Sequence, residues 1–183
     1  MDLLELLLKR RSVRKYTGEP VGREELELIL KAGLCSASGR NRKPWELVAV
    51  SDREMLERLS HCRDGAARML EKAGSAILVF ADVDRTDVWT EDCSIVMSNM
   101  HLMAASLGLG SCWIQGRLRT AENGESTDVF CRRLLGVPEG YALEAILSVG
   151  IPAEYPESHK AEELEMRKVH WNSWDACEND SGD

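Results

Sequence analysis

The sequence contains no apolar run long enough to cross a bilayer, since its longest purely apolar stretch is the six-residue segment 76–81. It also lacks the basic-then-apolar start of a signal peptide, because the leucines of residues 3–8 precede the first arginines. We therefore expect a cytoplasmic protein that does not bind membranes.

Closely spaced cysteines are missing too. There is no Cys-x-x-Cys pair, and the only cysteine next to a histidine is in the dipeptide His61-Cys62. A structural zinc site needs short ligand spacings, so we predict no metal site. We expect reduced and mostly buried thiols at all six cysteine positions, which are Cys35, Cys62, Cys93, Cys112, Cys131 and Cys177.

Familiar catalytic motifs are absent. Gly108-Leu-Gly110 resembles the start of a dinucleotide-binding loop, but Trp113 replaces its third glycine and the segment leads from a predicted helix into a strand, the reverse of the required order. No histidine has a serine or cysteine partner at a known nucleophile spacing, and His101 is expected to be structural. We predict no catalytic side chain, so the chemistry would belong to a bound cofactor.

The composition is that of one globular domain, with 183 residues, of which 44% are apolar and 30% charged. The net charge is −8, but it is unevenly distributed. Residues 1–50 contain ten basic and seven acidic residues, a net charge of +3, whereas the rest of the chain contains 13 basic and 24 acidic residues, a net charge of −11. An acidic body argues against nucleic-acid binding.

The positive charge lies in two short basic groups. The first group spans residues 9–15 with five cations, and the second comprises Arg40, Arg42 and Lys43. Such groups suit a compact anion such as a phosphate, although charge alone favours the simpler explanation, solvated charges at a helix end.

Apolar periodicity predicts alternating helices and strands, hence one α+β or α/β layered domain. The helices are expected at 2–10, 23–34, 52–62, 66–73, 91–107, 126–135 and, as a short possibility, 161–169; the strands are expected at 45–50, 75–82, 111–115 and 142–149. Strand 75–82 should be central and fully buried, because it is apolar almost throughout.

Two segments do not fit an isolated small domain. Helix 91–107 is apolar on nearly all sides, so it must lie at the centre of the fold or in a subunit interface. The polar tail 151–183 carries Trp171 and Trp174 with little else to bury, which indicates an arm laid over another surface.

Five blocks of sequence, in order, resemble the FMN-dependent nitroreductase family over roughly residues 3–170. They are Arg10-Arg-Ser-Val-Arg-Lys-Tyr16, Ser38-Gly-Arg-Asn-Arg-Lys-Pro-Trp45, Asn99-Met-His-Leu-Met-Ala-Ala105 with Gly108-Leu-Gly-Ser-Cys-Trp-Ile114, Leu134-Leu-Gly-Val-Pro-Glu-Gly-Tyr141 and Ser148-Val-Gly-Ile-Pro152. The resemblance implies a single α+β domain over 1–183, a sandwich with a mostly antiparallel central sheet flanked by helices. It also implies an intertwined homodimer in which the arm 151–183 embraces the partner.

The same resemblance places FMN at the dimer interface. The first block would hold the phosphate and ribityl chain, the second block would approach the partner's flavin, the strand after the glycines would lie against the isoalloxazine with a backbone amide near N5, and a C-terminal basic pair would reach the phosphate. The implied residues are, in that order, Arg10, Arg11, Ser12 and Arg14; Ser38, Gly39, Asn41 and Lys43; Trp113, Ile114, Gln115 and Gly116; and, by a loose match, Arg167 and Lys168. Guanidinium groups suit phosphate because they bind its oxygens in pairs.

Two residues depart from the family pattern: Lys43 replaces the usual glutamine before Pro-Trp, and Gln115 stands where many relatives carry glutamate. These changes affect substrate choice more than flavin binding. The expected function is an oxidoreductase in which NADH or NADPH reduces FMN and an electron-poor small molecule, such as a nitroaromatic or a quinone, then takes the donor's place in a ping-pong reaction. The alternatives are a non-catalytic flavin-binding or anion-binding module, and a flavin enzyme of another class, such as a reductive dehalogenase.

Overall fold

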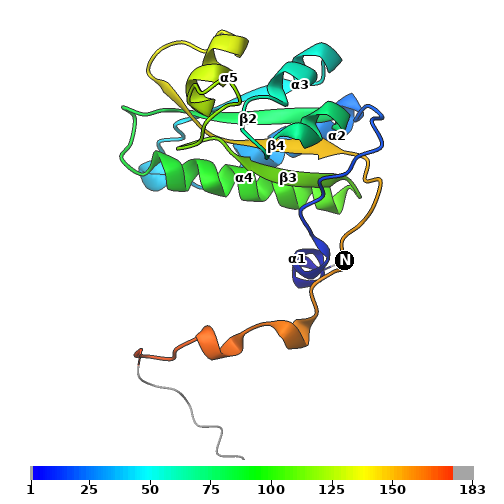
Figure 1. The fold of residues 1–183 in the computed structure, drawn as a ribbon. Helices are drawn as coiled ribbons and strands as arrows, with labels where there is room; N and C mark the ends of the chain where they lie inside the picture. Colours follow the sequence, from blue (N-terminus) through cyan, green and yellow to red (C-terminus); the bar gives the residue numbers. More distant parts are fainter. Residues whose placement is uncertain (1, 175–183) are drawn as a thin grey trace, which may run out of the picture.

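The computed structural model describes residues 2–174, and its centre is a four-stranded antiparallel sheet (Figure 1). In spatial order the strands are β1 (Trp45–Val50), β2 (Ser75–Asp82), β4 (Tyr141–Gly150) and β3 (Gly110–Gln115). Strand β2 is interior and buried along nearly its whole length, which confirms its expected central position. The fold class is α+β, as predicted.

Helices cover both faces of the sheet. The α-helices are α1 (Leu3–Lys9), α2 (Arg23–Leu34), α3 (Arg53–Leu59), α4 (Trp89–Ser106) and α5 (Thr127–Leu135). Side chains of α2 and α4 pack on one face in one apolar cluster, and those of α3 and α5 pack on the other face in a second cluster. Figure 1 shows α4 lying along the sheet opposite α3 and α5.

Three expected helices are shorter than predicted. Helix α3 ends at Leu59 rather than near Cys62, and segment 66–73 forms only a five-residue 3-10 helix, Arg68–Lys72. The expected helix 161–169 is two separate 3-10 turns, Ala161–Glu163 and Met166–Lys168, with no buried residue. Short helices need packing to persist, and this last segment has none.

Helix α4 has one buried side and one exposed side. Its buried face, which includes Val96, Met97 and Met100, packs against the sheet and α2, whereas Ile95 on another side is 40% exposed. Helix α1 stands away from the sheet with no buried residue, although its sequence is rich in leucine. Both α1 and α4 therefore have exposed apolar side chains.

The segment after β4 runs antiparallel to the segment after α1. The backbone N–H groups of Thr17, Ala153 and His159 donate to the carbonyls of Ile151, Lys15 and Leu8 over 3.0, 2.9 and 2.9 Å. Beyond this ribbon the chain passes α1 and extends away from the sheet (Figure 1). The side chains of Trp171 and Trp174 on this segment are exposed. Residues 10–14 are thus held between β3 and residues 151–159.

The cysteines in the described residues are free, and all of these except Cys35 are buried, as expected. Cys177 lies outside the described residues. Within residues 2–174 there is no cluster of metal-ligating side chains, and no helix is both long and apolar enough to span a bilayer.

Candidate functional site

Residues 10–13 lie along the free edge of β3. Helix α1 ends at Lys9, the backbone of Arg10 is extended, and two residues later Ser12 forms a parallel bridge with Ser111 of β3. The backbone N–H of Val13 donates to the Ser111 carbonyl over 2.9 Å, and the Val13 side chain is buried in the core. This anchoring leaves Ser12 half-buried and Arg14 exposed.

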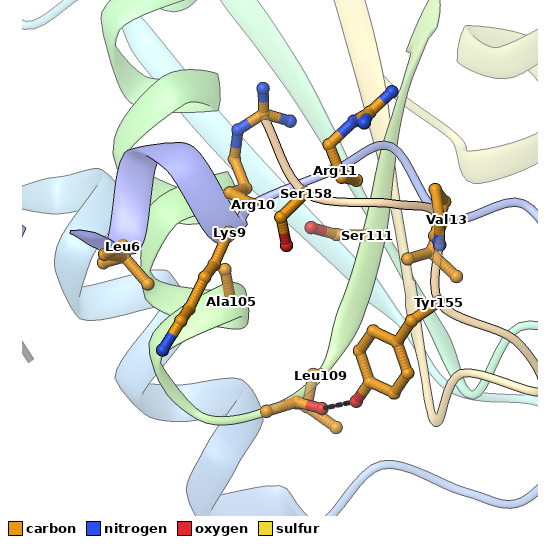
Figure 2. A pocket seen from close by; sticks show the side chains of 12 residues that line it. Leu6, Lys9, Arg10, Arg11, Val13, Ala105, Leu109, Ser111, Tyr155 and Ser158 are labelled. Carbon is orange, nitrogen blue, oxygen red and sulfur yellow. Dashed lines mark hydrogen bonds between the residues drawn. The ribbon is translucent and has the colours of Figure 1, made fainter. Parts of the chain in front are cut away.

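A cavity of about 330 Å³ opens beside this segment. It is lined by the basic residues Lys9, Arg10 and Arg11, by the serines Ser111 and Ser158, and by the mostly apolar residues Leu6, Val13, Ala105, Gly108, Leu109, Tyr155 and Pro156. Figure 2 shows the two serine side chains close together, with Lys9 on one side and Tyr155 on the other. Three cations and two hydroxyl groups around one small space make it suitable for an anion.

Hydrogen bonds fix the walls of this cavity. The Tyr155 hydroxyl donates to the Gly108 carbonyl over 2.8 Å, which closes the side next to the turn between α4 and β3. The Arg11 guanidinium donates to the Glu157 carbonyl, so the C-terminal segment is tied to the basic group.

His101 connects two cavity residues from behind. Its Nε2 lies 3.0 Å from an Arg10 guanidinium nitrogen, and its Nδ1 is hydrogen-bonded to the Ser111 hydroxyl. Burial, reinforced by the Arg10 charge, lowers the pKa of His101 to about 4. His101 is therefore a satisfied, neutral histidine at pH 7, as the sequence predicted, but it contacts the expected site.

Strand β3 divides its expected site residues between two faces. Trp113 and Gln115 share the α4 side, where the indole N–H donates to the Gln115 amide oxygen over 2.8 Å. The Ile114 side chain points to the opposite face and is buried in the other core, so only its backbone is available to a ligand at the α4 side. Side chains alternate along a strand, which is why four consecutive residues cannot all face one ligand.

The outer edge of β3 presents free backbone groups. The Gly116 N–H donates inward to the Glu144 carbonyl of β4 over 3.1 Å, whereas the Ser111 carbonyl accepts from Val13 on the outer side. Because pairing alternates in an antiparallel ladder, the N–H groups of Trp113 and Gln115 point outward. Gly116 itself is required by close packing, since a Cβ there would lie 2.6 Å from a Leu143 methyl carbon.

Glu144 is a buried acid close to the turn at Gly116. It is the extra residue of a β-bulge between β2 and β4, since Phe80 pairs with Leu143 and Val79 with Ala145. Its side chain is buried, its Oε2 has no hydrogen-bond partner within residues 2–174, and burial raises its pKa.

The loop that carries Ser38, Gly39, Asn41 and Lys43 is strained and anchored to α4. The backbones of Arg40, Asn41 and Lys43 are left-handed, with φ of 51°, 55° and 48°. Their side chains are exposed, whereas the Lys43 N–H donates to the Ser38 hydroxyl over 3.0 Å. Asp92 in the first turn of α4 accepts from the Gly39 N–H over 2.8 Å.

The two basic groups do not meet within one protomer. Their contacts with α4, at Asp92 and His101, are nine residues apart, which corresponds to about 13 Å along a helix. The expected C-terminal pair is not brought to the cavity either: Arg167 and Lys168 do not line it, are exposed, and pair with Glu165.

The comparisons with known proteins agree with this architecture. The family model described as "Nitroreductase family" matches residues 7–67 and 57–151, which is most of the chain. The chain belongs to the nitroreductase family. This membership confirms the resemblance seen in the sequence and the expected fold.

Individual nitroreductase-family relatives match over nearly their whole length. An Archaeoglobus fulgidus protein, provisionally named NADH dehydrogenase/NAD(P)H nitroreductase, is 33% identical over 94% of this chain and 99% of its own. A similarly named Methanothermobacter thermautotrophicus protein is 34% identical over 95% of this chain and 88% of its own. The solved structure of an FMN-dependent nitroreductase from Clostridium difficile R20291 is 42% identical, covers 94% of this chain and 100% of its own, and superposes with a TM-score of 0.90.

Sequence reasoning missed several residues of this nitroreductase-family site. Lys9 was part of the first basic group but was not assigned to the site. Ser111 lies on the same face of β3 as Trp113 and Gln115, and the alternation of side chains along a strand could have identified it. Tyr155 and Ser158 gave no local signal, because they reach the cavity only through the return of the chain after β4.

Proposed function

We propose that this protein is an FMN-dependent oxidoreductase in which NADH or NADPH and a small electron-poor acceptor, nitroaromatic or quinone-like, use one site in turn. Membership of the nitroreductase family makes it an NAD(P)H-dependent flavin oxidoreductase. The acceptor, the ping-pong order and the binding residues are the proposed part.

The residues present suit FMN. A phosphate needs cations and hydroxyl donors, which Lys9, Arg10, Arg11 and Ser111 supply around one cavity. The isoalloxazine offers hydrogen-bond acceptors along one edge, and β3 offers outward N–H groups at Trp113 and Gln115 a few residues further on. The main observation that supports the proposal is this row of hydrogen-bond donors, from the basic residues at the cavity to the backbone N–H groups along the edge of β3.

When bound, FMN supplies the hydride chemistry, and the protein supplies position and charge. In the proposed arrangement Arg10, Arg11, Ser12 and Arg14 would hold the phosphate and the ribityl chain, and their positive charge would stabilise the reduced flavin. Trp113, Gln115 and the backbone of Ile114 and Gly116 line the ring. A single open site over the flavin would make the donor and the acceptor use that site in turn.

The second half of each site would come from a partner protomer. The loop with Ser38, Gly39, Asn41 and Lys43 is too far along α4 to reach the cavity of its own chain. The exposed leucines of α1 and the exposed Trp171 and Trp174 provide apolar surface for an intertwined homodimer. The arm carrying Arg167 and Lys168 would then lie over the partner, with this basic pair next to the partner's phosphate.

Anaerobic stopped-flow absorbance tests the function. The purified flavoprotein mixed with NADH or NADPH should lose its flavin absorbance in one phase, and a nitroaromatic or quinone added afterwards should restore it. A protein that retains FMN but is bleached by neither donor would be a flavin-binding module instead. Reoxidation only by a halogenated aromatic, with halide release, would indicate the dehalogenase alternative.

A further inference from the structure

His101 interrupts the apolar sequence of α4, and both of its ring nitrogens form hydrogen bonds with residues that line the cavity. Nε2 meets the Arg10 guanidinium at 3.0 Å, and Nδ1 meets the Ser111 hydroxyl. His101 is 8% exposed and does not itself line the cavity. It therefore acts on any cavity ligand through its two neighbours.

The proton positions follow from the partners. A guanidinium has only donors, so Nε2 of His101 must carry the lone pair and accept from Arg10. The ring proton is then on Nδ1 and is donated to the Ser111 Oγ. The hydroxyl proton of Ser111 has no acceptor within residues 2–174, although the side chain is almost completely buried at the cavity wall.

We propose that His101 is a positioning residue for the flavin phosphate, which aims the Arg10 guanidinium and leaves the Ser111 hydroxyl proton free to be donated to the phosphate. This inference rests on the proposed function and adds Ser111 as a phosphate ligand. The Ser111 hydroxyl is hydrogen-bonded to His101, but its own proton has no acceptor in the described part of the chain, and an anion in the cavity would accept it.

Riboflavin separates the phosphate from the rest of the cofactor. We would titrate the flavin-stripped protein with FMN and with riboflavin and follow the quenching of flavin fluorescence. His101→Leu keeps a similar volume but removes both hydrogen bonds. It should weaken FMN binding about tenfold or more, the loss expected for a misplaced charge-assisted hydrogen bond, and leave riboflavin binding unchanged.

Further variants distinguish positioning from a merely structural role. His101→Gln offers one acceptor and one donor, so it should recover most of the FMN affinity. Ser111→Ala should lose FMN affinity but not riboflavin affinity, and it also decides the outcome if His101→Leu does not fold. In a double variant that already carries Arg10→Ala and Ser111→Ala, adding His101→Leu should cause no further loss of FMN affinity, because His101 acts only through those two residues.

The matched control is His61→Gln, which changes a part-exposed histidine that pairs with Glu122 away from the cavity. It should bind both flavins as the unmodified protein does. Equal losses of FMN and riboflavin affinity in His101→Leu, or no loss of either, would overturn the role of His101. If the unmodified protein binds neither flavin, the proposed function itself fails, and the two failures are thus distinguishable.

Discussion

The Asp92 carboxylate accepts a hydrogen bond from the backbone N–H of Gly39 over 2.8 Å, and this bond holds a strained loop against α4. The next residues, Arg40 and Asn41, both have left-handed backbones. A Cβ on Gly39 would approach a Val88 methyl carbon to 2.8 Å, so the loop and the helix are fitted closely. The loop that we assign to the partner's flavin therefore depends on a buried acid that no sequence motif contains.

We expect Asp92→Ala to release this loop and weaken FMN binding several-fold, because the Gly39 N–H would lose its acceptor. Asp92→Asn retains an acceptor oxygen and should bind FMN nearly normally. Flavin fluorescence titration measures both. Asp52→Ala is the matched control, since the Asp52 carboxylate also accepts a backbone N–H over 2.8 Å, but at the start of α3. Equal flavin affinity of Asp92→Ala and Asp52→Ala would contradict the assigned role.

Gly116→Ala should disturb the turn after β3. The new methyl group would lie 2.6 Å from a Leu143 methyl carbon, and overpacking of this kind lowers the free energy of unfolding by about 1–3 kcal/mol. The displaced turn should also alter the visible spectrum of bound FMN. Chemical denaturation and absorbance spectroscopy measure the two effects.

Leu143→Val removes one methylene next to Gly116 and tests whether the contact with Leu143 causes the loss of stability in Gly116→Ala. In the Gly116→Ala background it should restore part of the stability, whereas alone it should destabilise the protein. Strictly additive losses would show that the contact with Leu143 is not responsible.

Replacing both Trp171 and Trp174 with serine should weaken the proposed dimer without unfolding the core. Both side chains are exposed in one protomer, so they add no packing to its own core. Sedimentation velocity over a range of concentrations should show a shift towards monomer and, with it, loss of flavin. Leu118→Ser is a control, because Leu118 is 77% exposed on a turn of the body. A double variant that dimerises as tightly as this control would remove the arm from the interface.

Stability should fall on acidification in part because of His101. Its pKa is about 4 in the folded protein against an ordinary value of about 6.5, since burial and the adjacent Arg10 disfavour the protonated ring. Between pH 6.5 and 4 the unfolded chain therefore takes up a proton that the folded protein does not. This uptake lowers the free energy of unfolding by up to about 3 kcal/mol.

His101→Gln cannot take up that proton, so its free energy of unfolding should fall less than that of the unmodified protein between pH 7 and 4.5. Urea unfolding of both proteins at the two pH values, at one protein concentration, measures the difference. Identical pH dependence would show that His101 is not held neutral by the fold.

Much of the fold could be predicted from local sequence. The sequence predicts strand 75–82 with its exact bounds, because it is apolar and short. It also predicts a helix at 126–135, which in the structure begins one residue later, at Thr127, with Ser126 as its N-cap and Gly136 as its C-cap. The predicted helix at 161–169 forms only two short 3-10 turns, because this segment buries no side chain against its own chain.

The sequence by itself determined the family and the identity of the basic residues, because both depend on residue types in a fixed order. Only the tertiary structure decided which side chains converge. It brought Ser111, Ser158 and His101 to Arg10, turned Ile114 away, and left Arg167 outside the cavity. The reason is physical: strand alternation, a helix face and a returning chain segment are long-range geometry, and no local pattern of residues encodes the distance between them.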